Sequence, residues 1–248
     1  FVSPKAIPML ADADELMRRI ERLPGVQYTV LVPNLRGAER AAATGPDEFN
    51  LFMSVTEGHN RSNVRMSREQ SFEGLCEVIA LAGRERIPVN VSLSCCFGCP
   101  IDGEVTAQES LAWAARFLER GVTRLSLCDT TGMAYPAQVE ALTGEFLRRW
   151  PQAELTLHFH NTRGMGLANI LAGVQAGARR FDASLGGIGG CPYAPGATGN
   201  VCTEDVVHML HLQGFETGVN LEALIACARG LPALLGHDVP GQVMKAGR

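Results

Sequence analysis

The sequence predicts an α/β fold in which strands and helices alternate along the chain, with the size and order of a (β/α)8 barrel. Its 248 residues, of which 46% are hydrophobic, are close to the roughly 250 residues of such a barrel and suffice for a large buried core. Regular alternation is typical of βαβ units and a mostly parallel sheet. Polar or reactive side chains follow several predicted strands, and in a barrel those strand ends share the rim on which active sites are built.

The predicted helices follow from apolar spacing and from capping residues. Leu16, Ile20 and Leu23 recur at helical spacing in the first of them. Ser67 and Thr106 precede two later helices as N-caps, and Pro136 opens a third at a position that proline favours. Together these patterns predict helices over residues 12–23, 36–44, 68–84, 107–119, 136–149, 165–177, 203–213 and 220–231.

The predicted strands are short, mostly apolar segments near residues 1–3, 27–32, 49–55, 88–94, 124–128, 155–160 and 180–185. The first is cut short, because the sequence opens at Phe1 without an initiator methionine. We therefore expect an N-terminal piece with one more strand, the missing first strand of the barrel, and eight strands would close the barrel. The polar segment TEGHNRSNVRMS over 56–67 is predicted to be a loop.

We expect a single catalytic barrel domain over 1–248, with the C-terminal helices of about 203–248 packing on it. A doubly wound open sheet is the alternative architecture. Such a sheet would carry a phosphate-binding fingerprint after its first strand, and neither G-x-G-x-x-G nor G-x-x-x-x-G-K-[ST] occurs in the sequence.

Composition narrows the classes of partner. The net charge of −4 gives no basic footprint for nucleic acid, and no apolar run reaches the roughly 18 residues of a spanning helix. We therefore expect no nucleic-acid or membrane partner, and the brevity of the chain without a transit peptide favours the cytoplasm. The eight cysteines are expected to be reduced thiols, since Cys96-x-x-Cys99 has no second cysteine pair with which to hold zinc.

A His-x-His pair at the end of a predicted strand is the strongest candidate for a site. Side chains alternate along a strand, so His158 and His160 share one face while Phe159 takes the other. Two imidazoles side by side make half of a metal site, although two satisfied histidines at a strand end are the simpler interpretation. Asn200 is the candidate for a third donor. Two imidazoles with oxygen ligands suit Mg²⁺ or Mn²⁺ better than a tetrahedral Zn²⁺.

The glycine-rich loop over 186–200, GGIGGCPYAPGATGN, is predicted to be a lid over this rim. Cys191 lies within it and could deliver a proton, since an ordinary thiol pKa is about 8.5. A flexible connection is the alternative interpretation of the loop. Asp129 closes a strand before Thr130 and could orient a ligand or a substrate hydroxyl, and a cap for the next helix is the equal alternative. The polar residues Asn34, Glu57 and Asn63 also fall on predicted rim loops.

Six motifs in order make the chain similar to the hydroxymethylglutaryl-CoA lyase family. They are FVSPK, VPNLRG, SCCFGCP, CDTTG, HFHNTRG and GGIGGCPYAPGATGNVCTED, and they span Phe1 to about Leu221. The resemblance implies a metal-dependent (β/α)8 barrel that cleaves 3-hydroxy-3-methylglutaryl-CoA to acetyl-CoA and acetoacetate.

Matched residue by residue, the resemblance makes His158, His160 and Asn200 ligands of a divalent metal, Mg²⁺ or Mn²⁺. It makes Cys191 the acid/base of the mobile loop and gives Asp129 a supporting role at the catalytic centre. The family's Arg-Asp pair and a further glutamate would precede Phe1. The resemblance also implies an acyl-CoA thioester substrate, a homo-oligomer (dimer or tetramer), and a place in leucine degradation and ketone body metabolism.

Two departures from the family pattern H-C-H-D-T-Y-G lie beside the histidines. Asn161 stands where an aspartate is expected, and Arg163 stands where a tyrosine is expected. We therefore predict that both contact the substrate. Because of these two departures, the alternative remains that the chain carries out the same cleavage on another 3-hydroxy-3-alkylglutaryl-CoA or a related acyl-CoA. A condensing synthase of the isopropylmalate type and an inactive barrel that serves as a scaffold are further alternatives.

Overall fold

The computed structural model describes residues 1–5, 7–190 and 199–248. The chain divides into two compact units. The first comprises Phe1–Ser94, Gln108–Leu127 and Gln152–Glu154, and the second comprises Cys95–Ala107, Cys128–Pro151 and Leu155–Arg248. In the described part of the chain, no helix has both the length and the apolar character that crossing a membrane requires.

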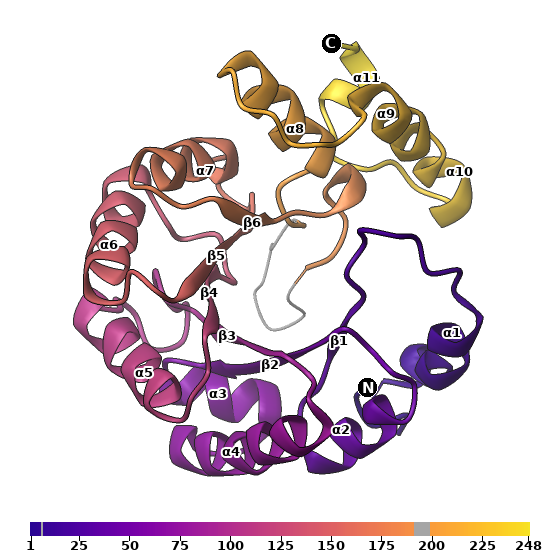
Figure 1. The fold of residues 1–248 in the computed structure, drawn as a ribbon. Helices are drawn as coiled ribbons and strands as arrows, with labels where there is room; N and C mark the ends of the chain where they lie inside the picture. The colour runs from indigo at the N-terminus through magenta and orange to yellow at the C-terminus, as the bar shows by residue number, and fades with distance from the viewer. Residues whose placement is uncertain (6, 191–198) are drawn as a thin grey trace. The chain divides into compact units, whose positions relative to one another are not determined.

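Strands and helices alternate through the described residues (Figure 1). The strands are β1 Thr29–Leu31, β2 Glu48–Ser54, β3 Val89–Ser94, β4 Arg124–Asp129, β5 Glu154–Phe159 and β6 Arg180–Asp182. The α-helices are α1 Ala13–Arg19, α2 Leu35–Ala42, α3 Glu57–Val64, α4 Arg68–Glu85, α5 Ala107–Glu119, α6 Pro136–Arg149, α7 Gly166–Gln175, α8 Thr203–Leu212, α9 Leu221–Arg229, α10 Leu231–Leu235 and α11 Val243–Ala246. Two 3₁₀ turns are η1 Pro8–Leu10 and η2 Leu185–Gly187.

The sheet keeps the order of the chain, β1-β2-β3-β4-β5-β6. Parallel pairing joins β1 to β2, β2 to β3 and β3 to β4, and likewise β5 to β6. Parallel neighbours in sequential order, each reached through a helical connection, are the arrangement of a (β/α)8 barrel. The structure thus confirms the predicted fold class as part of such a barrel.

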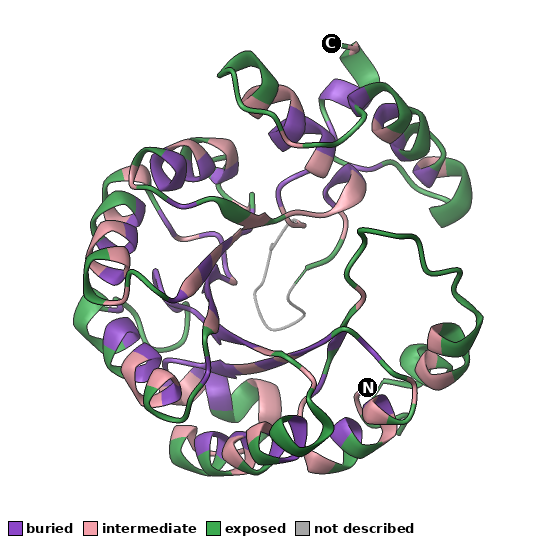
Figure 2. Cartoon of the chain, viewed as in Figure 1, coloured by how far each residue is buried: buried purple, intermediate pink, exposed green. Residues whose placement is uncertain are grey.

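In the first unit, β2 is buried along most of its length, as its largely purple ribbon in Figure 2 shows. Its fully buried apolar side chains are Phe49, Leu51 and Met53. Polar contacts fix the register beside it, because Asn90 Nδ2 donates to Asn50 Oδ1 at 2.8 Å and to Ser126 Oγ at 2.9 Å. Near-continuous burial is the pattern of a parallel strand covered on both faces.

An aromatic cluster joins α4 to α5 in the first unit. The ring of Phe72 lies 4.9 Å from that of Phe117 and 6.0 Å from that of Trp113. The guanidinium of Arg116 lies 4.2 Å from the Trp113 ring centroid and bonds both carboxylate oxygens of Glu69 at 2.6 and 2.7 Å. A planar, bidentate ion pair stacked on an indole is a strong use of arginine, so this cluster anchors two helices to each other.

In the second unit, the C-terminal helices pack through two small apolar clusters. One is formed by Val207 of α8, Leu221 and Ile225 of α9, and Val243 of α11. The other is formed by Ala228, Leu231, Val239 and Met244, against which Leu185 and Ile188 pack. The chain around residues 239–244 therefore lies against the segment that follows β6.

Several predicted element boundaries are confirmed, and the reasons are visible. Ser67 caps α4 in a capping box with Gln70, since each side chain bonds the other residue's backbone N–H. Pro136 opens α6 at its first turn. The helix predicted over 12–23 is only α1, Ala13–Arg19, because the chain turns extended at Ile20.

Two element predictions are wrong. Residues 1–3 form no strand, although the Phe1 amino group donates to Leu31 O of β1 at 2.7 Å. The predicted loop over 56–67 contains the helix α3. That helix has no apolar face to reveal it, since its two buried residues are His59 and Asn60, and both are held by hydrogen bonds.

Candidate functional site

The two histidines of the His-x-His pair lie together at the end of β5. The strand alternates, with Leu157 and Phe159 fully buried in the core and His158 partly exposed between them. The imidazole centroids of His158 and His160 are 5.2 Å apart at an interplanar angle of 59°. His158 Nδ1 lies 3.5 Å from Asp182 Oδ2 on β6, which leaves Nε2 of that ring for another partner. A carboxylate behind a histidine is a common way to orient a metal ligand.

Asn200 is brought beside this pair by the return of the chain after the glycine-rich loop. Residues 199–201 run antiparallel to 159–161, with an isolated bridge between His160 and Asn200. Two backbone bonds fix the approach: Asn161 N donates to Gly199 O, and Val201 N donates to Phe159 O, each at 3.1 Å. Asn200, which the sequence analysis proposes as a third metal ligand, is thus adjacent to the histidines although it lies forty residues after His160 in the chain.

The side chain of Asn200 presents an oxygen without a partner. Its Nδ2 donates to Ile188 O at 3.1 Å, while its Oδ1 is buried and has no hydrogen-bond partner among the described residues. A buried amide oxygen left unpaired is destabilising by about 1–3 kcal/mol. An acceptor held in this state beside two imidazoles fits a cation that would bind all three groups. Among the described residues, no group of three or more His, Cys, Asp or Glu side chains could hold a metal ion.

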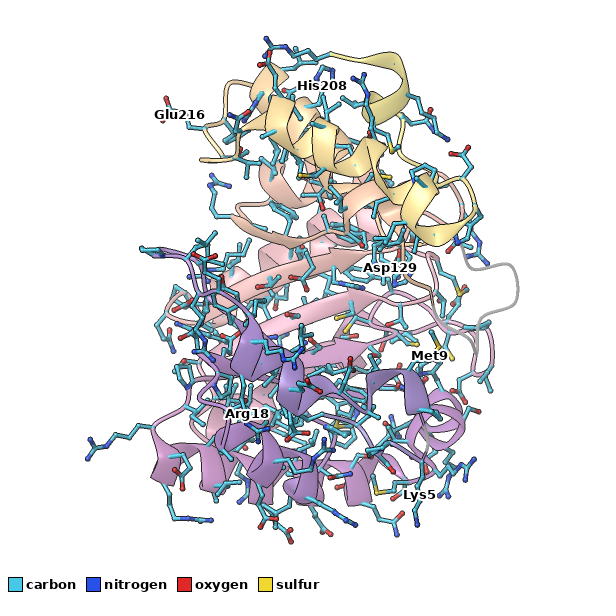
Figure 3. All side chains as sticks on the ribbon, turned by 90° about the vertical axis from the view of Figure 1, so that its right-hand side faces the viewer. Lys5, Met9, Arg18, Asp129, His208 and Glu216 are labelled. Carbon is cyan, nitrogen blue, oxygen red and sulfur yellow. The ribbon has the colours of Figure 1, made fainter. Side chains whose placement is uncertain are left out.

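Asp129 ends β4 and is buried, with 1% of its surface exposed; Figure 3 labels it. Its Oδ1 accepts hydrogen bonds from Met133 N at 2.7 Å and Ala134 N at 3.1 Å, so it caps the turn before α6. Its Oδ2 has no partner among the described residues. Burial raises the pKa of Asp129 to about 6, against the opposing effect of the two amide hydrogen bonds and of the charges on His158 and Arg163.

The side chains of Asn161 and Arg163 both bond backbone groups in the second unit. Asn161 Oδ1 accepts from Gly166 N at 3.0 Å, at the start of α7. Arg163 Nη1 donates to Thr131 O and Gly132 O, each at 2.9 Å, and so ties the loop after β5 to the loop after β4. The Arg163 bonds hold the loop after β5 against the loop after β4, whereas the Asn161 bond fixes the loop after β5 to the start of α7.

The remaining sequence candidates are distributed as follows. Cys191 lies outside the described residues. Asn34 is the N-cap of α2, since its Oδ1 accepts from Gly37 N at 3.0 Å. Glu57 accepts from Arg68 N at 3.0 Å and pairs with Arg61 of the same helix at 2.7 Å. No disulfide joins the cysteines in the described residues.

Sequence reasoning missed one acidic residue beside the site and two buried acidic residues in α8. Asp182 lies behind His158. Glu204 and Asp205 are buried in the first turn of α8, where they accept backbone hydrogen bonds. Acidic residues are common in the first turn of a helix because they complement its dipole. Their type and position therefore carried no signal that their side chains turn inward.

The fold and the site together define a barrel protein of the α/β class with two imidazoles and an amide oxygen gathered where β5 ends. The chain belongs to the HMGL-like family, whose model matches residues 7–230.

Similar proteins cover nearly the whole chain. It is 42% identical to the hydroxymethylglutaryl-CoA lyase YngG of Bacillus subtilis, over 98% of this chain and 81% of that protein. It is 41% identical to the (R)-citramalyl-CoA lyase of Chloroflexus aurantiacus, over 100% of this chain and 81% of the other. A solved HMG-CoA lyase of Acinetobacter baumannii, in complex with coenzyme A and 3-methylmalate, has a TM-score of 0.95 and 48% identity, covering 100% of this chain and 81% of that one.

Proposed function

We propose that this chain is a carbon–carbon lyase that cleaves 3-hydroxy-3-methylglutaryl-CoA to acetyl-CoA and acetoacetate. The observation that carries the proposal is the likeness to HMG-CoA lyases over nearly the full chain, at 42% identity for the B. subtilis enzyme and 41% for that of Pseudomonas mevalonii. The His-His-amide arrangement supports it, since it supplies three donors at the end of one strand.

We further propose that His158, His160 and Asn200 hold a divalent metal ion, Mg²⁺ or Mn²⁺. The amide oxygen, with water completing the shell, is the kind of ligand that these ions favour, and the two imidazoles add nitrogen ligands at fixed positions. A divalent ion bound there supplies Lewis acidity toward the substrate's hydroxyl and carbonyl oxygens. Asp182 keeps the ring of His158 oriented, and Ile188 O holds the Asn200 amide with its oxygen free.

The protein groups would then act on defined atoms of the substrate. The C3 hydroxyl would pass its proton to Asp129 Oδ2, directly or through a bound water, as the C2–C3 bond breaks. Acetoacetate then leaves with the new ketone, and the electron pair stays on C2 as the enolate of acetyl-CoA. Cys191 donates the proton that C2 then takes. The unpartnered Oδ2 of Asp129 is free to accept a hydrogen bond from the substrate hydroxyl or a bound water.

The proposed test is a turnover assay with the purified chain and Mn²⁺. The expected result is stoichiometric acetyl-CoA and acetoacetate from 3-hydroxy-3-methylglutaryl-CoA, with a KM below that for other thioesters. The absence of acetoacetate from a folded, metal-loaded protein would contradict the proposal.

A second candidate substrate is (R)-citramalyl-CoA, because a lyase named for it matches all of this chain at 41% identity. Breaking the corresponding bond there gives acetyl-CoA and pyruvate. A higher kcat/KM with pyruvate as the product would favour this second function over the first. We propose that Asn161 and Arg163 contribute to the choice of acyl group, since they brace the loops beside the histidines.

We propose a homo-oligomer, a dimer or a tetramer, that acts in the cytoplasm on acyl-CoA thioesters in leucine degradation and ketone body metabolism. Light scattering of the purified protein tests the oligomer, and a single monomeric species would contradict it.

A further inference from the structure

We propose that Asp205 and Glu204 are positioning residues, which bind the C-terminal segment 239–244 and the segment 185–189 to one another and thereby hold Asn200 in its ligand geometry. The inference rests on the proposed function, because it takes Asn200 to be a metal ligand. It extends that function to a part of the chain that touches no substrate.

The two carboxylates lie next to each other in the first turn of α8 but bond different segments. Glu204 Oε2 accepts from Gly186 N at 3.0 Å. Asp205 accepts from Gln242 N at 3.1 Å and from Val243 N at 2.7 Å. Both are buried, at 0% and 6% exposure. Charge-assisted bonds to backbone N–H groups are stronger than neutral ones, so α8 fixes both segments.

The two segments also contact each other directly. Gly241 N donates to Gly186 O at 3.2 Å, and Leu185 and Ile188 pack against the cluster that contains Val239 and Met244. The fit leaves no spare room. A Cβ added to Gly241 would lie 2.3 Å from Glu204 Oε1 and 2.9 Å from Met244 Sδ.

The segment 185–189 in turn fixes Asn200. Ile188 O accepts the hydrogen bond from Asn200 Nδ2, and this bond decides which end of the amide is free. The backbones are in close contact, since a Cβ on Gly187 would lie 3.1 Å from Asn200 O and one on Gly199 would lie 1.6 Å from Gly187 O. A shift of residues 186–188 must therefore move or turn the amide. The same segment leads directly toward Cys191 in the sequence.

Stability alone does not account for this arrangement. Replacement of buried charges by apolar side chains is often neutral or stabilising, and Glu204 Oε1 has no partner among the described residues. Two buried carboxylates aimed at backbone amides around one short segment are better explained by the geometry that they impose on it.

The test compares three variants of the full chain. Asp205→Ala removes the acceptor, whereas Asp205→Asn keeps an amide oxygen where both backbone donors converge. Glu222→Gln is the matched control, since it weakens the 2.6 Å pair with Arg248 near the C-terminus without touching residues 185–189. Mn²⁺ affinity, kcat, KM and hydrogen exchange of residues 185–189 and 199–202 are measured on each.

We expect Asp205→Ala to bind Mn²⁺ about 10-fold more weakly, the lower end of the loss that follows when the support of a metal ligand is disturbed. Its kcat should fall while its KM for the thioester changes little, and amide exchange should accelerate in both segments. Asp205→Asn should restore most of the Mn²⁺ affinity, and Glu222→Gln should match the parent protein. Where Asp205→Ala does not fold, Gly241→Ala takes its place, with the same expectation.

Unchanged exchange and unchanged Mn²⁺ affinity in a folded Asp205→Ala variant would overturn the inference, even with a lowered Tm. A parent protein that binds no Mn²⁺ and cleaves no thioester would overturn the proposed function instead. In that case, faster amide exchange in Asp205→Ala would by itself still show that Asp205 holds segments 239–244 and 185–189 together. The two failures are therefore distinguishable.

Discussion

At the scale of single residues, two of the buried oxygens that lack a hydrogen-bond partner among the described residues belong to the candidate site. Asn200 Oδ1 and Asp129 Oδ2 are buried and without hydrogen-bond partners among the described residues, although each residue's other polar atom is bonded. Native proteins rarely leave buried acceptors unpaired unless a ligand, an ion or water completes them. Both oxygens belong to residues that the sequence motifs had already singled out. Burial and orientation, rather than residue type, thus support the proposed assignments.

Substitution of Cys191 should distinguish metal binding from proton transfer. We expect Cys191→Ala to retain Mn²⁺, because the thiol is not among the proposed ligands, and to lose turnover by about 10²–10⁴-fold, the usual contribution of a general acid. Elemental analysis and steady-state kinetics measure the two effects. Cys227→Ala is the matched control, since this thiol is exposed on α9. Full turnover by Cys191→Ala would refute the assignment.

The buried carboxyl of Glu204 should make the thermal stability of the protein depend on pH. Burial raises the pKa of its carboxyl, and the neighbouring charge of Asp205 acts in the same direction. A raised pKa in the folded state means that folding favours the protonated form of Glu204. The stability that protonated Glu204 contributes is therefore fully present below the unfolded-state pKa and is lost as the pH rises through the folded-state pKa. Glu204→Gln, which cannot ionise, should therefore raise Tm at pH 8 and leave it nearly unchanged at pH 4.

Thermal scans of both proteins across that pH range measure the difference. The amide oxygen of Gln can still accept from Gly186 N, so the substitution removes the charge and not the hydrogen bond. A gain in Tm that is the same at every pH would show that ionisation of Glu204 is not its cause.

At the scale of elements, α3 shows how a helix can be held by polar contacts in place of an apolar face. Asn60 Oδ1 accepts from Ser54 N at 3.0 Å, and its Nδ2 donates to Met66 O and Ser71 Oγ at 2.9 and 2.8 Å. His59 Nδ1 lies 2.5 Å from Ser54 Oγ. These bonds fix α3 to the end of β2 and to α4 without any hydrophobic periodicity.

We expect Asn60→Ala to lower the free energy of unfolding by about 3 kcal/mol, because it leaves several buried polar groups unpaired. Urea unfolding followed by circular dichroism measures the change. Asn63→Ala is the control on the same helix, since Asn63 is only partly buried. Equal effects of the two substitutions would mean that helix propensity, and not the buried contacts, sets the stability of α3.

At the scale of the whole molecule, what could be predicted from the sequence depended on periodicity. The alternation of strands and helices, and the shared face of His158 and His160, follow from local repeats of 3.6 and 2 residues. The sequence could name Asn200 as a candidate ligand but could not place it beside the histidines, because a glycine-rich loop does not determine where the chain returns to the sheet. The inward turn of Glu204 and the bracing bonds of Arg163 depend on tertiary contacts that no local pattern encodes.

The three proposed ligands, His158, His160 and Asn200, predict a linkage between metal binding and global stability. An ion that binds only the folded chain stabilises it by RT ln(1 + [L]/Kd), about 2.7 kcal/mol at 100 times Kd. For a chain of this size that corresponds to a rise in Tm of roughly 5–10 °C. Calorimetry of chelator-treated protein, with and without Mn²⁺, should show this rise, and His160→Ala should abolish it. An undiminished rise in His160→Ala would place the ion elsewhere in the molecule, and no rise in the parent protein would remove the metal from the proposed site altogether.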